Sequence, residues 1–309
     1  LVGSEMCIRD RYYNKYSVDL LAAINGSPTQ GFGYTTLMTN NGKMVNRGVE
    51  ITLSGEIIRQ KDFSWNASLL YAFNRNKVKH ISVQPSLWDS RISMPTSYPM
   101  VGKPLYGIYA YKWAGLNENG DPQVYDAENN VTSGPARDYH ALVYCGTTVP
   151  IHNASLTNVL RYKGFEFSAM LILDAGHKLR SSNIPSINMS NGRITSTAKG
   201  IVDRWTQPGD VTDVPRLLFS NDTENFNTHR TELYRYSDLF VYDASNIRLS
   251  NISLAYRVPA HWCKKISLSG ARLQFNVENV ATFAFDSKAN YDLGGKVKPN
   301  YVWGLYLNF

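Results

Sequence analysis

The sequence predicts an all-β fold that forms part of the wall of an antiparallel transmembrane β-barrel. Aromatic residues are abundant, with 20 Tyr, 12 Phe and 6 Trp in 309 residues, and such residues favour pleated strands. Several long segments alternate apolar and polar residues with a period of two, which is the pattern of a strand with two different faces. No apolar run approaches the roughly 18 residues of a membrane helix. A membrane location therefore requires a closed barrel.

Segment 63–74 shows the alternation most clearly. Its odd positions hold Phe, Trp, Ala, Leu, Tyr and Phe, whereas its even positions hold mostly Ser, Asn and Ala. Segments 49–57, 165–173 and 271–278 repeat the pattern. In a barrel wall, the apolar side chains meet lipid and the polar ones line the lumen. In a soluble β-sandwich, the polar side chains would face water instead, so this alternative stays open.

The connections between these strands alternate between short and long. The short ones are 59–62, 163–164 and 259–265, and the long ones are 26–46, 80–152, 178–245 and 286–300. Barrels with periplasmic turns and extracellular loops give this alternation, and they need an even number of strands. The expected wall strands are about eight, at 12–24, 47–58, 63–79, 153–162, 165–177, 246–257, 266–283 and 301–309.

The two longest connections, about 80–152 and 178–245, are expected to be extracellular loops. Because the wall strands that flank the first of them cross in opposite senses, everything between those strands lies on one side of the membrane. The strand-like segment 106–113 therefore cannot be a single wall strand. We expect it to pair locally as a hairpin, with 123–125 as the suggested partner.

The last nine residues are the strongest local signal. Tyr301, Trp303, Leu305, Leu307 and Phe309 alternate onto one face and end on the terminal aromatic. Such a strand can close a barrel and remove a sheet edge, with its aromatic residues at the membrane boundary. The pattern also resembles the C-terminal signal that the outer-membrane assembly machinery reads. A buried last strand of a soluble β domain is the alternative.

The first residues do not resemble a protein start. The chain opens Leu1-Val2-Gly3 with no initiator Met and no signal peptide, and residues 1–11 resemble translated sequencing adapter. We expect this tail to be non-native, a sequencing artefact, and the native protein to extend further upstream. Residues 12–309 would then be the C-terminal part of a larger barrel. An ordinary disordered tail is the alternative.

The sequence shows no pattern of enzymatic, metal or nucleic-acid chemistry. The net charge of +7 is spread along the chain, so no nucleic-acid partner is expected. The six His include no pair at a metal-ligand spacing, and catalytic and phosphate-binding motifs are absent. Asp174 and His177 lack an accompanying nucleophile and are expected where a strand meets a loop. Cys7, Cys145 and Cys263 form neither a disulfide framework nor a metal motif. We expect no catalytic residue, no metal and no cofactor.

Short motifs follow one another from about residue 12 to the end of the chain. They are Asn46-Arg47-Gly48-Val49-Glu50-Ile51, Phe63-Ser64-Trp65, Val101-Gly102-Lys103-Pro104 with Tyr106-Gly107, Gly115-Leu116 with Gly120-Asp121-Pro122, Asn158 with Tyr162-Lys163-Gly164-Phe165, 203–210 with Pro215-Arg216, 247–256, 276–279 and Pro299-Asn300-Tyr301. No single motif is diagnostic. Their order and spacing together resemble the SusC/RagA family of TonB-linked outer-membrane proteins of the Bacteroidetes.

The resemblance implies a large barrel, plugged in its complete form, that imports glycan oligomers or peptides. Energy would come from the TonB complex through an N-terminal part that this sequence lacks, and a SusD-like surface lipoprotein would act as a lid. The implied location is the cell outer membrane, where a multi-pass β-barrel contacts lipid. Because plugged transporters close with about 22 strands, this chain would be only part of such a wall.

Aromatic and charged residues of the long loops are candidate contacts for a ligand or partner. They are Trp88, Tyr98, Arg204, Trp205, Asp210 and Tyr236. Aromatic rings could stack on sugar rings or on peptide side chains. Segment 203–210 has a second interpretation, because Pro208-Gly209 favours a self-packed turn in which Arg204 pairs with a nearby carboxylate.

The predicted function is energised import across the outer membrane by a protein that is not an enzyme. One alternative is a soluble secreted β-sandwich that binds carbohydrate, which would not sediment with membranes. A second alternative is a passive porin or adhesin barrel, which would lack an upstream plug.

Overall fold

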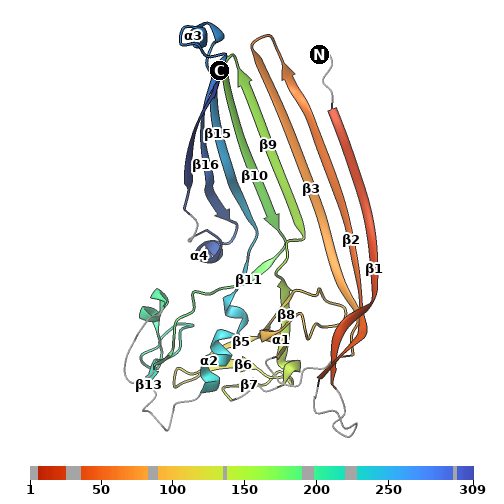
Figure 1. The fold of residues 1–309 in the computed structure, drawn as a ribbon. Coiled ribbons are helices and arrows are strands. Elements are labelled where there is room, and N and C mark those ends of the chain that lie inside the picture. The colour runs from red at the N-terminus through yellow and green to blue at the C-terminus, as the bar shows by residue number, and fades with distance from the viewer. Residues whose placement is uncertain are drawn as a thin grey trace.

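A large open sheet dominates the computed structural model, which describes residues 6–25, 36–82, 90–134, 138–189, 198–219, 228–294 and 298–309. The sheet has eight antiparallel strands, and each pairs with the next sheet strand along the chain (Figure 1). The strands are β1 (Met6–Asn25), β2 (Thr36–Arg59), β3 (Phe63–His80), β9 (His152–Tyr162), β10 (Phe165–Ala175), β15 (Asn246–Arg257), β16 (Gly270–Ala284) and β17 (Asn300–Asn308). The predicted all-β, antiparallel fold with eight wall strands is confirmed. β1 and β17 are the two edges, so the sheet is not closed in this chain.

The strand boundaries differ from the expected ones by more than two residues at three places. β2 begins at Thr36, within an expected loop, because β1 and β2 continue to pair beyond two register shifts next to Leu20. β16 begins at Gly270 instead of residue 266, because the preceding residues form helix α3 (Ala260–Lys264) and a turn. β1 starts at Met6 and so includes part of the stretch 1–11, whose non-native origin stays a prediction.

A tight turn fixes the register in the centre of the sheet. Lys163 has a φ of 51°, and with Gly164 it joins β9 to β10 so that Tyr162 lies opposite Phe165. Left-handed residues are what two-residue hairpin turns require. A Cβ at Gly164 would lie 2.8 Å from the carbonyl oxygen of Arg257, so only glycine fits at that position.

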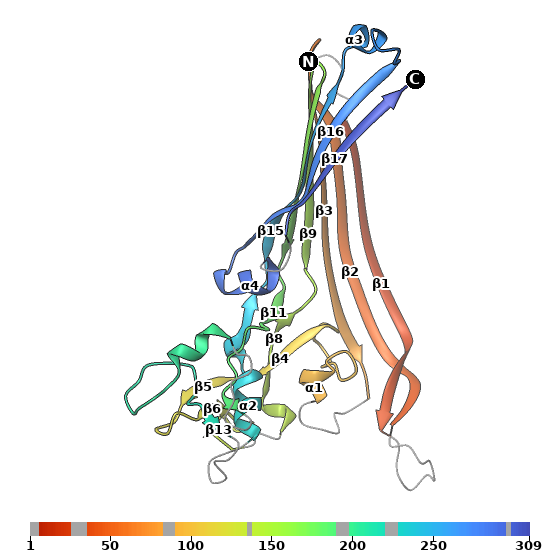
Figure 2. The same cartoon turned by 60° about the vertical axis from the view of Figure 1, so that its left-hand side comes forward.

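The two long connections fold together at the other end of the sheet, opposite α3 (Figures 1 and 2). We call this unit the loop body; it comprises the described residues between 90 and 151 and between 176 and 245. Its strands are β4 (Gly107–Tyr111), β5 (Trp113–Leu116), β6 (Pro122–Tyr125), β7 (Val131–Thr132), β8 (Leu142–Thr147), β11 (Lys178–Arg180), β12 (Asn188–Met189), β13 (Leu218–Phe219) and β14 (Val241–Asp243). Its helices are α1 (Ser90–Ser93), α2 (Thr228–Arg235) and the 3-10 helices Tyr139–Ala141, Lys199–Asp203 and Asp238–Phe240. Outside the loop body, the 3-10 helix Ser287–Ala289 and helix α4 (Asn290–Leu293) lie between β16 and β17.

The closely packed core of the protein lies in the loop body and not on the large sheet. One buried cluster contains Tyr109, Tyr111, Val124, Ala141, Leu142 and Leu233, and a second contains Ile187, Tyr234 and Phe240. Trp113 packs on both clusters, with its ring 5.9 Å from that of Tyr234. Because residues of both long connections share this core, the two connections form one folded unit.

The expected hairpin of 106–113 with 123–125 is wrong for most of the segment and correct only at its end, where Trp113 begins β5. β5 pairs with β6, with Trp113 opposite Val124, but β4 pairs with β8 instead. All five residues of β4 are buried. The second long connection contributes to this burial, because Arg180 donates to the Tyr109 carbonyl at 2.6 Å and Tyr111 N donates to the Tyr236 carbonyl at 2.9 Å. A local alternation pattern does not show such contacts between distant segments.

The helices of the described residues are short. None has the length and apolar composition needed to cross a bilayer.

Candidate functional site

One face of the large sheet carries rows of apolar side chains in register; each row crosses six or seven neighbouring strands, and together the rows reach all eight. Residues that lie directly opposite each other in neighbouring strands point to the same face. Three such rows, here called the apolar band, are Phe63, Tyr162, Phe165, Tyr256, Leu273 and Leu305; Ile58, Trp65, Leu160, Phe167, Leu254, Phe275 and Trp303; and Ile8, Leu53, Leu69, Leu156, Leu171 and Leu249. Tyr301, Trp303, Leu305 and Leu307 of β17 all lie opposite apolar residues of β16 on this face, as their alternation predicts. A role of these residues and of Phe309 in barrel closure or assembly stays a prediction.

The apolar band is exposed in this chain. Trp303 is 78% exposed, Phe165 51% and Leu254 47%. The remaining sheets of the described residues have only two or three strands each and belong to the loop body. The second sheet that a β-sandwich would lay over the band is therefore not found in the described part of the chain. An exposed apolar surface of this extent requires an apolar environment.

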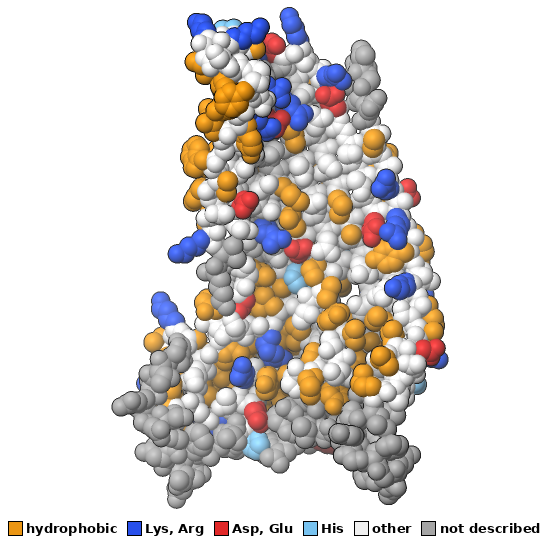
Figure 3. Space-filling view, in the orientation of Figure 1, with side chains coloured by type: hydrophobic (Ala, Val, Ile, Leu, Met, Phe, Trp, Pro, Cys, Tyr) orange, Lys and Arg blue, Asp and Glu red, His pale blue; other side chains and the backbone are white. Residues whose placement is uncertain are grey.

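The opposite face, here called the polar face, carries polar side chains on the same strands. Two of its rows are Asn66, Val159, Ser168, Ser253, Asn276 and Val302, and Ser68, Thr157, Met170, Asn251, Glu278 and Asn300. Glu166 accepts hydrogen bonds from Arg161 Nε at 2.7 Å and from Arg272 at 3.1 Å. In Figure 3, white atoms prevail over the upper sheet and the charged side chains form small groups. A hollow of about 500 Å³ opens on this face beside Ser54, Glu56, Asn66 and Thr157.

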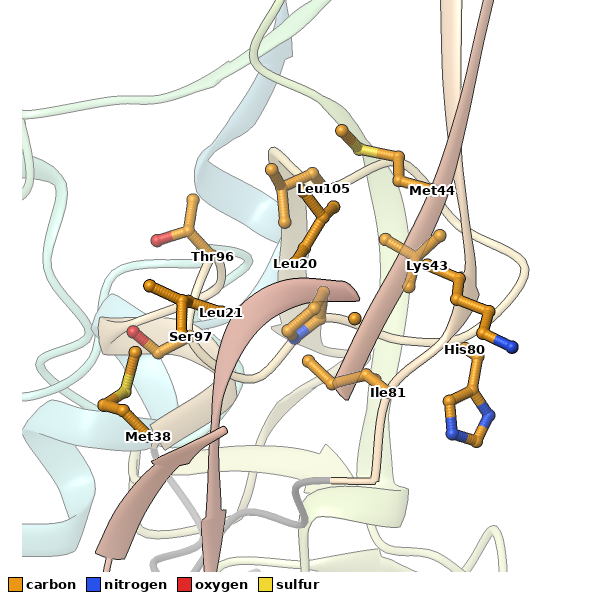
Figure 4. Close-up of a pocket in the computed structure, with 13 residues that line it drawn as sticks. Leu20, Leu21, Met38, Lys43, Met44, His80, Ile81, Thr96, Ser97 and Leu105 are labelled. Carbon is orange, nitrogen blue, oxygen red and sulfur yellow. The ribbon is translucent and has the colours of Figure 1, made fainter. Parts of the chain in front are cut away.

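An apolar pocket of about 430 Å³ lies where the bent ends of β1 and β2 face the segment after α1. Figure 4 shows Leu20, Leu21, Met38, Met44 and Leu105 around it, with Lys43 and His80 at one side. None of the candidate contact residues that the structure describes lines this pocket. The pocket therefore does not gather the predicted contacts into one binding site.

An ion cluster around Asp121 joins the two halves of the loop body. Arg216 donates to both carboxylate oxygens of Asp121, at 3.1 and 2.8 Å. Arg230 donates from Nε to Asp121 at 2.7 Å and from its two terminal nitrogens to Asn188 Oδ1 and the Arg216 carbonyl. Arg230 is only 3% exposed, and burial lowers the pKa of its guanidinium while Asp121 opposes that shift. We call these four residues the Asp121 cluster.

Trp205 packs on the residue that precedes Asp121. Gly120 has a φ of 74°, and a Cβ at this position would overlap the Trp205 indole. Trp113, from the same connection as Gly120, donates from its indole Nε1 to Asp213 at 3.0 Å and from its backbone N–H to Asp238 at 2.9 Å. Two motifs that are far apart in the sequence, 115–122 and 203–216, are therefore neighbours in the loop body.

Replacing Gly120 by Ala is expected to loosen the packing of Trp205. The new Cβ meets the indole, and the left-handed backbone costs a further 1–2 kcal/mol or so. Faster proteolysis within 198–219 of the full-length protein measures the effect. Gly209→Ala is the matched control, because Gly209 also has a positive φ, of 98°, but no heavy atom lies within 4 Å of its Cβ position. Equal cleavage of the two variants would contradict a role for the indole contact.

The predicted contact residues that the structure describes fall in three segments of the loop body: Tyr98, the turn with Arg204, Trp205 and Asp210, and Tyr236. Trp88 lies outside the described residues. Tyr98 is half-buried, and its backbone N–H donates to the Met94 carbonyl. Tyr236 lies beside two guanidinium groups, those of Arg180 at 5.6 Å and Arg235 at 5.9 Å. Trp205 contacts Gly120. The described candidate aromatic residues Tyr98, Trp205 and Tyr236 do not line a common cavity.

The structure gives segment 203–210 a local fold. Asp210 Oδ2 accepts hydrogen bonds from Thr206 N and Oγ1, both at 2.8 Å, and from Gln207 N at 3.0 Å. Arg204 donates to the Ile201 carbonyl at 3.4 Å, and it forms no ion pair within the described residues. These contacts stabilise the turn. A ligand or partner contact by Arg204, Trp205 or Asp210 stays a prediction.

The turn at Asp210 is expected to open in acid. The Thr206 backbone N–H, followed by the other two donors, holds the pKa of Asp210 below its ordinary value of 3.8. A lowered pKa in the folded state means that the carboxylate stabilises the turn above pH 3.8 and loses this contribution as the pH falls below that value. Cleavage within 198–219 by pepsin, relative to cleavage elsewhere, should rise over this range. The Asp210→Asn variant should show no such rise; a rise of equal size in it would contradict the assignment.

Sequence reasoning missed the Asp121 cluster. Asp121 and Arg216 lie within motifs that carry the family resemblance, but nothing in either motif indicates that the two residues pair. Arg230 gives no sequence signal, because it is one of many Arg residues in a polar segment. Among the described residues, no group of three or more His, Cys, Asp or Glu could hold a metal ion.

Two curated relatives of this chain are described as TonB-dependent receptors. No protein-family model matches it. TonB-dependent receptor P3 of Formosa agariphila is 24% identical over 88% of this chain and 28% of the relative. TonB-dependent receptor SusC of Bacteroides thetaiotaomicron is 23% identical over 87% of this chain and 26% of the relative. The chain thus spans about a quarter of the length of these curated relatives.

A solved structure shares the fold. The RagAB peptide transporter matches with a TM-score of 0.73 and 21% sequence identity, over 98% of this chain and 33% of the matched chain. At this level of identity the match shows the fold alone, which extends over nearly the whole of this chain.

Proposed function

We infer that this chain, a relative of the SusC-like TonB-dependent receptors, forms part of the wall of an outer-membrane barrel that imports nutrients. The observation that carries the proposal is the apolar band, whose rows together reach all eight strands, with the polar face behind it. A sheet with these two faces is matched to lipid on one side and an aqueous lumen on the other. β9 and β10 have 11 residues each, enough for a tilted strand to cross the hydrocarbon core.

The proposed cargo is glycan oligomers or peptides. The relative of known structure is described as a peptide transporter, which supports the peptide half of the proposal. A SusD-like surface lipoprotein would cover the loop body, and the TonB complex would supply energy through a part of the protein outside this chain. The loop body supports this assignment, because its shared core and the Asp121 cluster give an outer surface that can hold a fixed shape.

The proposed contacts to cargo or lipoprotein are the loop residues named from the sequence. Of these, Tyr98, Arg204, Trp205, Asp210 and Tyr236 are in the loop body. Their separation suggests several weak contacts over a broad surface rather than one deep pocket. We propose no catalytic role for any of them.

Fractionation and uptake by cells that express the full-length protein test this proposal. The protein should sediment with outer membranes and need detergent for release, and cells without it should lose uptake of one class of oligomer. Collapsing the proton gradient should also abolish that uptake, because TonB-linked import is energised. Recovery in the soluble fraction would overturn the membrane assignment. Uptake that persists without the gradient would favour a passive barrel instead.

A further inference from the structure

The connection between β15 and β16 is a rigid turn. After α3, Ser267 has a φ of 58°. Leu268 N donates to the Cys263 carbonyl at 3.0 Å, and Ser267 N donates to the Lys264 carbonyl at 3.3 Å. These two bonds and the left-handed residue form a Schellman motif, which ends a helix in a defined geometry. Cys263 is 1% exposed and Leu268 8%, so the pair holds the turn against the end of the sheet.

The outer surface of this turn combines exposed apolar and basic side chains. Trp262 is 55% exposed and Ile266 67%. His261, Lys264 and Lys265 are also exposed. No acidic residue occurs between Arg257 and Arg272, so Lys264 and Lys265 have no acidic neighbour within the connection, whereas Arg272 pairs with Glu166.

We propose that the α3 turn is an interfacial anchor that binds the phospholipid headgroup region of the bilayer. The proposal rests on the membrane assignment made above. Trp is favoured at membrane interfaces because its ring is apolar and its N–H is polar. Lysines near the surface are attracted to anionic headgroups. The rigid turn keeps Trp262 and Ile266 pointing outward, so little conformational entropy is lost when they enter the interface.

Position and charge favour lipid over a protein partner. The α3 turn lies at the end of the sheet opposite the loop body, next to the C-terminus (Figure 2). Ser269 binds the chain end, through its N–H to the Asn308 carbonyl at 2.8 Å and through Oγ to the Phe309 carbonyl at 3.3 Å. Phe309 is 92% exposed. The turn is thus adjacent to the end of the apolar band that is remote from the loop body, and it extends the band with aromatic and basic groups.

Fluorescence quenching by brominated phospholipids tests the anchor. The full-length protein is reconstituted into vesicles of phosphatidylethanolamine and phosphatidylglycerol that carry bromine on acyl carbons near the glycerol. The fluorescence of Trp262 is obtained as the difference in emission between the unchanged protein and the Trp262→Phe variant. We expect that emission to fall by about half in brominated vesicles, as for a ring at the interface. With Lys264→Gln and Lys265→Gln together, the quenching should become weaker in anionic vesicles and stay unchanged in zwitterionic ones.

Trp303 separates the possible outcomes, because it belongs to the apolar band. Quenching of Trp303, isolated in the same way with Trp303→Phe, together with an unquenched Trp262 would overturn the anchor and leave the membrane assignment standing. Such a result would point to a second copy or another protein on the turn. If neither Trp is quenched, the membrane assignment itself fails. If the two Lys substitutions left the quenching of Trp262 in anionic vesicles unchanged, this result would contradict the headgroup contact.

Discussion

Replacing Asp121 by Ala is expected to separate the two long connections of the loop body. Arg230 is 3% exposed. Without the Asp121 carboxylate, its buried guanidinium would have no counter-charge. Removing one partner of a buried ion pair lowers the free energy of unfolding by about 3–5 kcal/mol. Hydrogen–deuterium exchange of the full-length protein should therefore accelerate in peptides on both sides of the cluster, in 107–125 and in 198–219 and 228–235, while the strands of the large sheet keep their protection.

Asp126→Ala is the matched control for this substitution. Asp126 belongs to the same connection, but its carboxylate accepts hydrogen bonds only within its own turn, from Glu128 N at 3.0 Å and from Asn130 N and Nδ2 at 2.7 and 3.3 Å. Its loss should accelerate exchange near residue 130 and nowhere else. If Asp121→Ala changed exchange in 228–235 no more than Asp126→Ala, the cluster would not be what joins the two connections.

The large sheet was predictable because its information is local. Period-two alternation and the lengths of the connections identify a strand from its own residues, as in 63–74, and pairing with the next strand along the chain needs no long-range information. The β1–β2 hairpin is longer than expected. Its extension was not predicted, because residues Met38 to Asn46 do not alternate regularly between apolar and polar. Their pairing depends on the partner strand rather than on their own pattern.

The loop body was not predictable to the same degree, because contacts between distant residues form it. β4 pairs with β8 across more than thirty residues, and Asp121 pairs with Arg230 at a sequence separation of 109. Charged side chains in a polar segment are read as solvated by default, and only the folded structure shows that Arg230 is buried. The α3 turn was missed for a related reason: at this length a helix carries no periodic signal.

Replacing Leu156 by Lys is expected to have the second large effect, and it tests the assignment of the two sheet faces. Leu156 lies opposite Leu69 and Leu171 in the apolar band. A lysine that faces lipid near the middle of the bilayer costs about 2–4 kcal/mol. The free energy of unfolding of the full-length protein in lipid vesicles, from urea titration, should fall by this amount, and less protein should reach the outer membrane.

Thr157→Lys is the matched variant, because Thr157 is the next residue on β9 and lies opposite Ser68 and Met170 on the polar face. A lumen-facing lysine stays hydrated, so the free energy of unfolding should change by less than about 1 kcal/mol. A larger loss for Thr157→Lys than for Leu156→Lys would contradict the assignment of the two faces, because the two residues are adjacent and both half-exposed in this chain. A soluble sandwich would bury the same apolar band under a second sheet, so the order of the two variants would be the same there, but its free energy of unfolding would not depend on lipid vesicles. A loss at Leu156 that is measured only in vesicles therefore assigns the apolar band to lipid.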